Sequence, residues 1–215
     1  MSQRFDLIIF DWDGTLVDSV DWIVHCIQQA AAEYGCPIPE PQAAKDIIGL
    51  SIENAIGQLF PDIDNTLRTQ VIAHYANTFF SRQISRDDLF PGVYPMLRQL
   101  KDQGFRLAIA TGKKTAGLSR AIEATGVADL FDATRCSDQT ASKPDPLMLE
   151  EIIGELNADR RKTLMVGDSA HDLQMANNAG IAAIGVTCGA HSASTLRQYQ
   201  PLMCLNYPTE LLEHL

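Results

Sequence analysis

Short apolar runs alternate with helical repeats along most of this chain. The run Leu7-Ile8-Ile9-Phe10 predicts a strand that is buried on both faces, as in a parallel sheet. Further strands are predicted at 106–111, near 131–134, at 163–166 and at 183–186, and helices at 93–103, at 146–156 and before Gly126 and Gly180. Because strands and helices alternate, we expect parallel βαβ units and an α/β fold with a Rossmann-like, three-layer core.

The segment between residues 18 and 85 departs from this alternation. Apolar residues recur there at helical spacing from Val20 to Tyr34 and from Leu67 to Phe79, and no strand pattern interrupts them. We therefore expect an all-helical insertion after the first strand, above the carboxyl edge of the sheet. The predicted organisation is an α/β core domain of residues 1–17 and 86–215, with residues 18–85 as a helical cap domain that forms a lid.

Charge and composition narrow the range of partners and locations. The 215 residues carry a net charge of -10, which argues against general nucleic-acid binding. The apolar runs fall far short of the roughly 20 residues needed to span a bilayer, and the N-terminus lacks a signal-peptide pattern. The five cysteines are widely spaced without a Cys-x-x-Cys pair, which favours reduced thiols. We expect a cytoplasmic protein without a nucleic-acid or membrane partner.

Acidic side chains follow two of the predicted strands. Asp11 and Asp13 come directly after the first strand, and in an extended chain they would point the same way, about 7 Å apart. Their like charges require a metal ion, a shared proton or a basic partner. Asp168 follows the strand at 163–166. Together these three carboxylates offer hard oxygen ligands that suit an octahedral Mg²⁺.

Groups suited to binding phosphate lie at neighbouring strand and helix ends. Thr111 offers a hydroxyl at the end of its strand, and Gly112 offers a backbone N–H at the start of the next helix. Lys143 precedes a helix for which Asp145 is the expected N-cap and Pro146 the first residue, so its side chain is expected to be free to point at a ligand. A metal, a lysine and backbone amides can stabilise phosphoryl transfer, while one carboxylate attacks and a second moves the proton.

These residues resemble the motifs of the haloacid dehalogenase-like (HAD) superfamily. The four matching strings occur in the family's order and are Asp11-x-Asp13-Gly14-Thr15-Leu16-Val17-Asp18-Ser19, Thr111-Gly112, Lys143-Pro144 and Gly167-Asp168-Ser169-x-x-Asp172. The helical insertion resembles the type 1 cap of the phosphoglycolate phosphatase-like branch. The resemblance implies Mg²⁺-dependent hydrolysis of a small phosphorylated metabolite through an aspartyl-phosphate.

The resemblance also assigns roles to individual residues. Asp11 would be the nucleophile and Asp13 the general acid and base. The metal would be held by Asp11, by Asp168 and by Asp13 through its backbone carbonyl, with Asp172 in support. The phosphoryl group would be bound by a set of three residues, namely Thr111, Gly112 and Lys143.

Other functions stay open at this stage. Asp13 argues against a dehalogenase, and Ile23 and Ile52 stand where the β-phosphoglucomutase branch usually has a histidine and an arginine. A phosphosugar mutase, a pyrophosphatase, a phospho-acceptor module and a non-catalytic binding protein are the alternatives. Lys113 is interpreted as a surface charge, and Lys45 as a candidate for contact with the far end of the substrate.

Overall fold

The core of the protein is a six-stranded parallel sheet. The computed structural model describes residues 5–215. The strand order is β3-β2-β1-β4-β5-β6, so β1 lies between β2 and β4. The strands are β1 (Leu7–Phe10), β2 (Arg106–Thr111), β3 (Ala133–Cys136), β4 (Thr163–Gly167), β5 (Ala182–Val186) and β6 (Cys204–Leu205). The predicted α/β class with a parallel sheet is confirmed.

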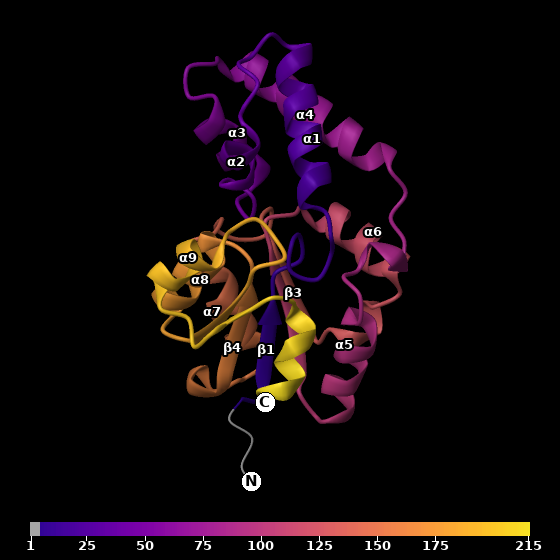
Figure 1. Cartoon of the computed structure of the whole chain (residues 1–215), viewed down its shortest axis with the longest axis vertical. Coiled ribbons are helices and arrows are strands. Elements are labelled where there is room, and N and C mark those ends of the chain that lie inside the picture. The colour runs from indigo at the N-terminus through magenta and orange to yellow at the C-terminus, as the bar shows by residue number, and fades with distance from the viewer. Residues whose placement is uncertain (1–4) are drawn as a thin grey trace.

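Helices cover both faces of this sheet and make three layers (Figure 1). One face packs against α5 (Val93–Asp102) and α6 (Thr115–Thr125), and the other against α7 (Leu147–Glu155), α8 (Ala170–Ala179) and α9 (Ala193–Leu196). In β1, Ile8 and Phe10 join the first of these clusters and Leu7 and Ile9 the second. All four are fully buried, and the burial of each side chain stabilises the fold by about 1.5–3 kcal/mol. The uninterrupted apolar run of β1 is thus explained by burial on two sides.

A helical block stands above the carboxyl edge of the sheet (Figure 1). Its helices are α1 (Val20–Glu33), α2 (Pro41–Lys45), α3 (Ile52–Leu59) and α4 (Asn65–Ser81). They have apolar contacts of their own, in which Ile27, Ile56 and Val71 are fully buried. The Trp22 indole N–H also donates a hydrogen bond to the Phe79 carbonyl at 3.3 Å. The helices therefore form a separately packed block over the strand ends.

Some elements differ from their predicted positions. Strand β3 begins at Ala133 rather than near 131, because a 3₁₀ turn, η2 (Ala128–Leu130), precedes it. Helix α7 begins at Leu147, so Pro146 is its N-cap, and the Asp145 carboxylate accepts a hydrogen bond from the Leu147 N–H at 2.9 Å. Helix α9, strand β6 and the 3₁₀ helix η5 (Pro208–Glu213) complete the chain.

The remaining short 3₁₀ segments connect the larger elements. They are η1 (Arg86–Asp88), η3 (Arg160–Lys162) and η4 (Arg197–Tyr199). Within residues 5–215, every helix is too short or too polar to span a lipid bilayer.

Candidate active site

Three buried carboxylates meet at the carboxyl edge of the sheet. Asp11 follows β1, Asp168 follows β4, and Asp172 lies in the first turn of α8. Because β1 and β4 are neighbours, the three side chains converge, and one oxygen from each lies within 4.8 Å of the others. All three residues are at most 2% exposed. Such a concentration of negative charge away from water requires positive charge beside it.

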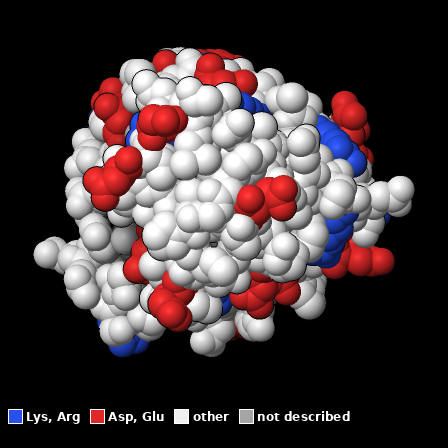
Figure 2. All heavy atoms as spheres, turned by 90° about the horizontal axis from the view of Figure 1, so that it is seen from above, with Lys and Arg blue, Asp and Glu red and all other residues white. Residues whose placement is uncertain are grey.

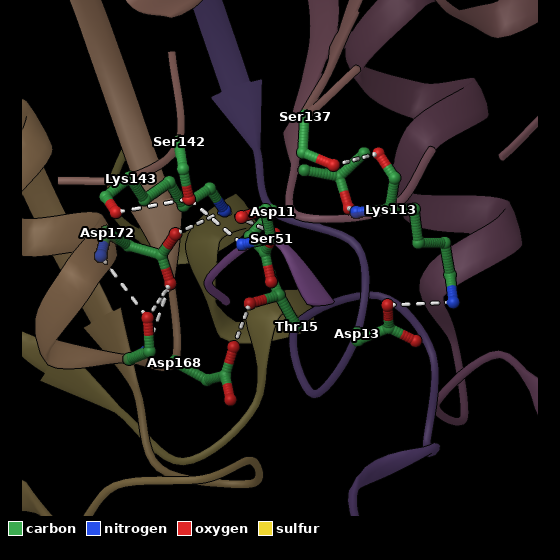
Figure 3. Close-up of polar contacts among 12 residues, drawn as sticks. Asp11, Asp13, Thr15, Ser51, Lys113, Ser137, Ser142, Lys143, Asp168 and Asp172 are labelled. Carbon is green, nitrogen blue, oxygen red and sulfur yellow. Dashed lines mark hydrogen bonds and ion pairs between the residues drawn. The ribbon is translucent and has the colours of Figure 1, made fainter. Parts of the chain in front are cut away.

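Lys143 supplies part of that positive charge (Figure 3). Its ammonium lies 2.5 Å from Asp11 Oδ1 and 2.6 Å from Asp172 Oδ1, and its side chain is fully buried. Burial alone would lower the pKa of Lys143, but the two carboxylates raise it above its ordinary value. The expectation of a lysine free to point at a ligand is therefore wrong, because Lys143 is engaged by two carboxylates.

Two hydrogen bonds hold the Asp168 carboxylate in place. The Thr15 hydroxyl donates to Asp168 Oδ1 at 2.8 Å, and the Ala190 N–H donates to Oδ2 at 2.7 Å. Burial and the charge of Asp172 nevertheless raise the pKa of Asp168 to about 7. Gly14, with φ of +80°, permits this arrangement because a Cβ there would overlap the Asp168 carboxylate.

Asp172 is fixed by the start of its own helix. Ser169 is the N-cap of α8, and its N–H and hydroxyl donate to Asp172 Oδ2 at 3.0 and 2.6 Å. The Ser169 hydroxyl in turn accepts a hydrogen bond from the Asp172 N–H. This capping box leaves the other Asp172 oxygen directed at Lys143. Asp172 therefore connects the helix start to the buried lysine.

The buried cluster has the composition of a divalent cation site. When all three carboxylates are ionised, they and one ammonium carry two net negative charges, which one divalent cation would neutralise. Burial raises the pKa of Asp11 well above its usual range, although Lys143 opposes this shift. Buried carboxylate oxygens are ligands that Mg²⁺ and similar hard cations prefer. The residues present therefore fit a divalent metal.

Asp13 belongs to a second, separate ion pair. The backbone bends at Trp12, so the Asp13 carboxylate turns toward Lys113 while that of Asp11 turns toward Lys143 (Figure 3). Asp13 Oδ2 lies 2.9 Å from the Lys113 ammonium, and Oδ1 accepts a hydrogen bond from the Ser19 hydroxyl at 2.7 Å. Each of the two aspartates of the first motif therefore has its own lysine.

Lys113 is a site residue that the sequence interpretation missed. We expected a surface charge, but its side chain is only 11% exposed and lines the cavity. The sequence feature that could have identified it as a site residue is its position two residues after Thr111, in the turn between β2 and α6. Thr111 itself is 1% exposed, and its hydroxyl accepts a hydrogen bond from the Lys113 N–H at 3.2 Å.

Gly112 lies under the helical block. Helix α6 begins at Thr115, so Gly112 is in the preceding turn rather than at the helix start. A Cβ on Gly112 would overlap the backbone carbonyls of Gly49 and Leu50, in the loop before α3. The absence of a side chain thus lets this loop approach the sheet edge closely.

One cavity joins the sheet edge to the helical block. It has a volume of about 160 Å³, and five of its lining residues come from the sheet edge, namely Asp11, Asp13, Thr111, Gly112 and Lys113. The opposite wall comes from α1, α3, α4 and the loop between α2 and α3. Lys143 and Asp168 lie beneath this floor, both at most 1% exposed. A ligand in the cavity would therefore meet Asp11 and Asp13 directly.

Comparisons with known proteins point to one family of hydrolases. Residues 8–186 match the model of a family described as haloacid dehalogenase-like hydrolase. The chain is 37% identical over 210 residues to IndB of Dickeya dadantii, named a probable phosphatase, and the alignment covers 96% of this chain and 91% of the relative. It is 31% identical over 208 residues to phosphoglycolate phosphatase of Vibrio cholerae, covering 93% and 92%.

A solved structure shares the same architecture. The crystal structure of a hydrolase from Pseudomonas syringae superposes with a TM-score of 0.88 over 97% of each chain, at 22% identity, which shows a common fold. The family match covers the first motif, the buried cluster and the helical block between them. By its sequence, its fold and the residues at its sheet edge, the chain belongs to the haloacid dehalogenase-like hydrolase family.

Proposed function

We propose that the protein is a phosphatase that hydrolyses a small phosphomonoester through an aspartyl-phosphate on Asp11. The observation that carries this proposal is the position of Asp11. Its carboxylate forms part of the cavity floor, Lys143 holds one of its oxygens, and a second carboxylate, Asp13, lines the same cavity. A nucleophile and a proton carrier thus face one ligand-sized space.

The proposed reaction uses these two aspartates in turn. In the first step the Asp11 carboxylate attacks phosphorus, the bond from phosphorus to the ester oxygen breaks, and Asp13 gives its proton to that oxygen, which leaves as the alcohol. In the second step Asp13 takes a proton from water, the water oxygen attacks phosphorus, and the Asp11–phosphorus bond breaks to release phosphate. The Ser19 hydroxyl and the Lys113 ammonium orient the Asp13 carboxylate for both transfers.

Other residues of the site bind charge. Thr111 and the Gly112 N–H would bind the phosphoryl oxygens, and Lys143 would fix Asp11 and offset the charge that these oxygens carry. We propose Mg²⁺ as the cation, held by Asp11, Asp168 and the Asp13 carbonyl. When bound, Mg²⁺ would supply Lewis-acid stabilisation of the phosphoryl oxygens.

The proposal extends to domain organisation. Residues 1–17 and 86–215 would form the catalytic core domain and residues 18–85 a cap domain that closes over Asp11. The cap carries its own buried clusters and approaches the core at Gly112, which supports a unit able to move as one body. All five cysteines are free thiols, in keeping with a cytoplasmic location.

Hydrolysis is favoured over phosphosugar transfer by the cap wall. Ile23 and Ile52, which replace the polar residues usual in the mutase branch, both line the cavity. Neither can bind the hydroxyl groups of a sugar. The phosphoryl group of Asp11 would therefore pass to water.

Hydrolysis of p-nitrophenyl phosphate with Mg²⁺ tests the proposed function. The wild-type protein should release nitrophenol, and EDTA should stop the reaction. Asp11→Asn should lower kcat by at least about 1,000-fold because it removes the nucleophile. Asp145→Asn is the matched control, since the Asp145 carboxylate accepts a hydrogen bond from the Leu147 N–H outside the cavity lining, and the variant should keep wild-type activity. Activity retained in Asp11→Asn would reject the assignment.

A further inference from the structure

The cap wall of the cavity is apolar and aromatic. Isoleucines from α1, α3, α4 and the loop between α2 and α3 face the cavity, together with Tyr75, Phe79 and Phe80 of α4. The Tyr75 and Phe79 rings stack with centroids 5.8 Å apart, and the Phe79 and Phe80 rings meet edge to face at 5.4 Å. A substrate with its phosphoryl group on the polar floor would therefore place the rest of its atoms against carbon.

The two basic residues that line the cavity are already paired with carboxylates. Lys113 is bound to Asp13 at 2.9 Å. Lys114 is bound to Glu53 at 2.6 Å, and both of these side chains are half exposed to solvent. The Lys113 ammonium also lies 4.3 Å from the centre of the Phe79 ring in the apolar wall, where Asp13 holds it. A negative charge on the organic part of a substrate would thus have to break one of these pairs.

The surrounding surface adds little positive charge; the Arg120 guanidinium lies 5.6 Å from the centre of the Phe80 ring, outside the cavity lining. Lys45, the sequence candidate for contact with the far end of the substrate, is outside the cavity lining and lies 3.2 Å from Asp21. Figure 2 shows the molecule from above, on the side of the helical block; the middle of this face is mostly uncharged, and acidic side chains are scattered over it. The scattered acidic side chains would not concentrate a ligand that carries a second anionic group.

The Tyr75 hydroxyl is the polar side-chain group of the aromatic wall. It has no hydrogen-bond partner among residues 5–215, and Tyr75 lines the cavity. Burial raises the pKa of Tyr75, and the negative charge of Asp13 adds to the effect, so the hydroxyl remains a donor at neutral pH. It can bind one polar atom of a ligand, but it cannot satisfy the several hydroxyl groups of a sugar.

We propose that the substrate is the phosphate monoester of an uncharged, mainly aromatic alcohol with one six-membered ring. This inference rests on the proposed phosphatase function and defines its substrate class. The cavity volume of about 160 Å³ must hold the phosphoryl group as well, and roughly 150 Å³ accommodates one benzene ring in an engineered protein core, so the organic group can be no larger than a single ring. A carboxylate placed against this wall would lose its hydration, and the Lys113 ammonium at the wall is already paired with Asp13.

Matched esters test this substrate class. Benzyl phosphate, 4-carboxybenzyl phosphate and 2-phosphoglycolate are all esters of simple alkyl alcohols, so their intrinsic reactivities are similar. We expect kcat/KM for benzyl phosphate to exceed that for each of the other two by at least about 30-fold, since an unpaired buried charge costs at least about 2 kcal/mol. A smaller ratio for either ester, with hydrolysis intact, overturns the inference and leaves the proposed function standing. If none of the three esters is hydrolysed, that result contradicts the proposed function itself.

A charge placed in the wall provides the second test. Ile72→Lys adds an ammonium to the wall at α4, and it should reduce the preference for benzyl over 4-carboxybenzyl phosphate by at least about 10-fold. Ile38→Lys is the matched control, because Ile38 is 60% exposed and outside the cavity lining, and it should leave the preference unchanged. An equal preference in both variants overturns the assignment of this wall to the organic group. If Ile72→Lys does not fold, the wild-type ratios decide the question.

Discussion

The buried Lys143 allows the electrostatics of the site to be tested without a substrate. In Lys143→Met a chain of similar length replaces the ammonium, so two ion pairs of 2.5 and 2.6 Å are lost and Asp11 and Asp172 remain buried. Removing one partner of a buried pair costs about 3–5 kcal/mol, because the other charge stays uncompensated. For a chain of this length, that corresponds to a fall in Tm of about 6–20 °C.

Urea unfolding followed by circular dichroism, in EDTA and near neutral pH, measures this loss. Lys162→Met is the matched control, because Lys162 and Asp6 form an exposed pair at 3.2 Å and should contribute less than about 1 kcal/mol. Lys143 lowers the pKa of Asp11, so in Lys143→Met this pKa rises further. The folded variant then retains a proton that the unfolded chain releases. Its loss of unfolding free energy relative to the wild type should therefore shrink as the pH falls. A deficit no larger than that of Lys162→Met would refute this reasoning.

Two further variants test the metal cluster and the contact between cap and core. The raised pKa of Asp168, about 7, means that its stabilising protonation is complete below about pH 4 and is lost as the pH rises through 7. In EDTA, the Tm of Asp168→Asn should therefore rise relative to that of the wild type as the pH rises from about 4 to 8. Mg²⁺ should raise the Tm of the wild type only. Parallel plots of Tm against pH for the two proteins would contradict this reasoning. Gly112→Ala should lower kcat/KM at least about 10-fold, because its Cβ displaces the Gly49 and Leu50 carbonyls, whereas Gly154→Ala, with open space around it, should keep full activity.

The sheet could be predicted because its central strands are buried on both faces. The residues of β1 form one short, uninterrupted apolar run, and such a run is typical of a central strand in a parallel sheet. Strand β6 contains only Cys204 and Leu205, which is too short for any periodicity to appear. It joins the sheet only through its pairing with β5. Long, regular elements were thus predictable, and the short edge elements were not.

The site was predictable in its residues and less so in its contacts. The order of the strands brings Asp11 and Asp168 to one edge, since residues that follow parallel neighbours must lie close together. The partners of Lys143 and Lys113 depend on the paths of loops and turns, for which the sequence carries no periodic signal. Both lysines were therefore assigned wrong surroundings.

The cap shows a similar ambiguity. Tyr75 and Phe79 lie on the apolar face of α4 that the helical spacing predicts, yet both line the cavity as well as packing within the cap. An apolar stripe does not distinguish a core from the wall of a binding cavity. The chemical character of the substrate site therefore became visible only from the packed side chains.

Detection of a phosphoryl group on Asp11 during turnover tests the central claim most directly. The Asp13→Asn variant should form the aspartyl-phosphate but hydrolyse it slowly, because the base that activates water is missing. Mixing this variant with p-nitrophenyl phosphate and Mg²⁺, quenching in acid and sequencing the peptides by mass spectrometry should locate a phosphoryl group on Asp11. Asp11→Asn should show none. Turnover by the wild type without phosphorylated Asp11 in either wild type or Asp13→Asn, or with the label on another residue, would contradict the account.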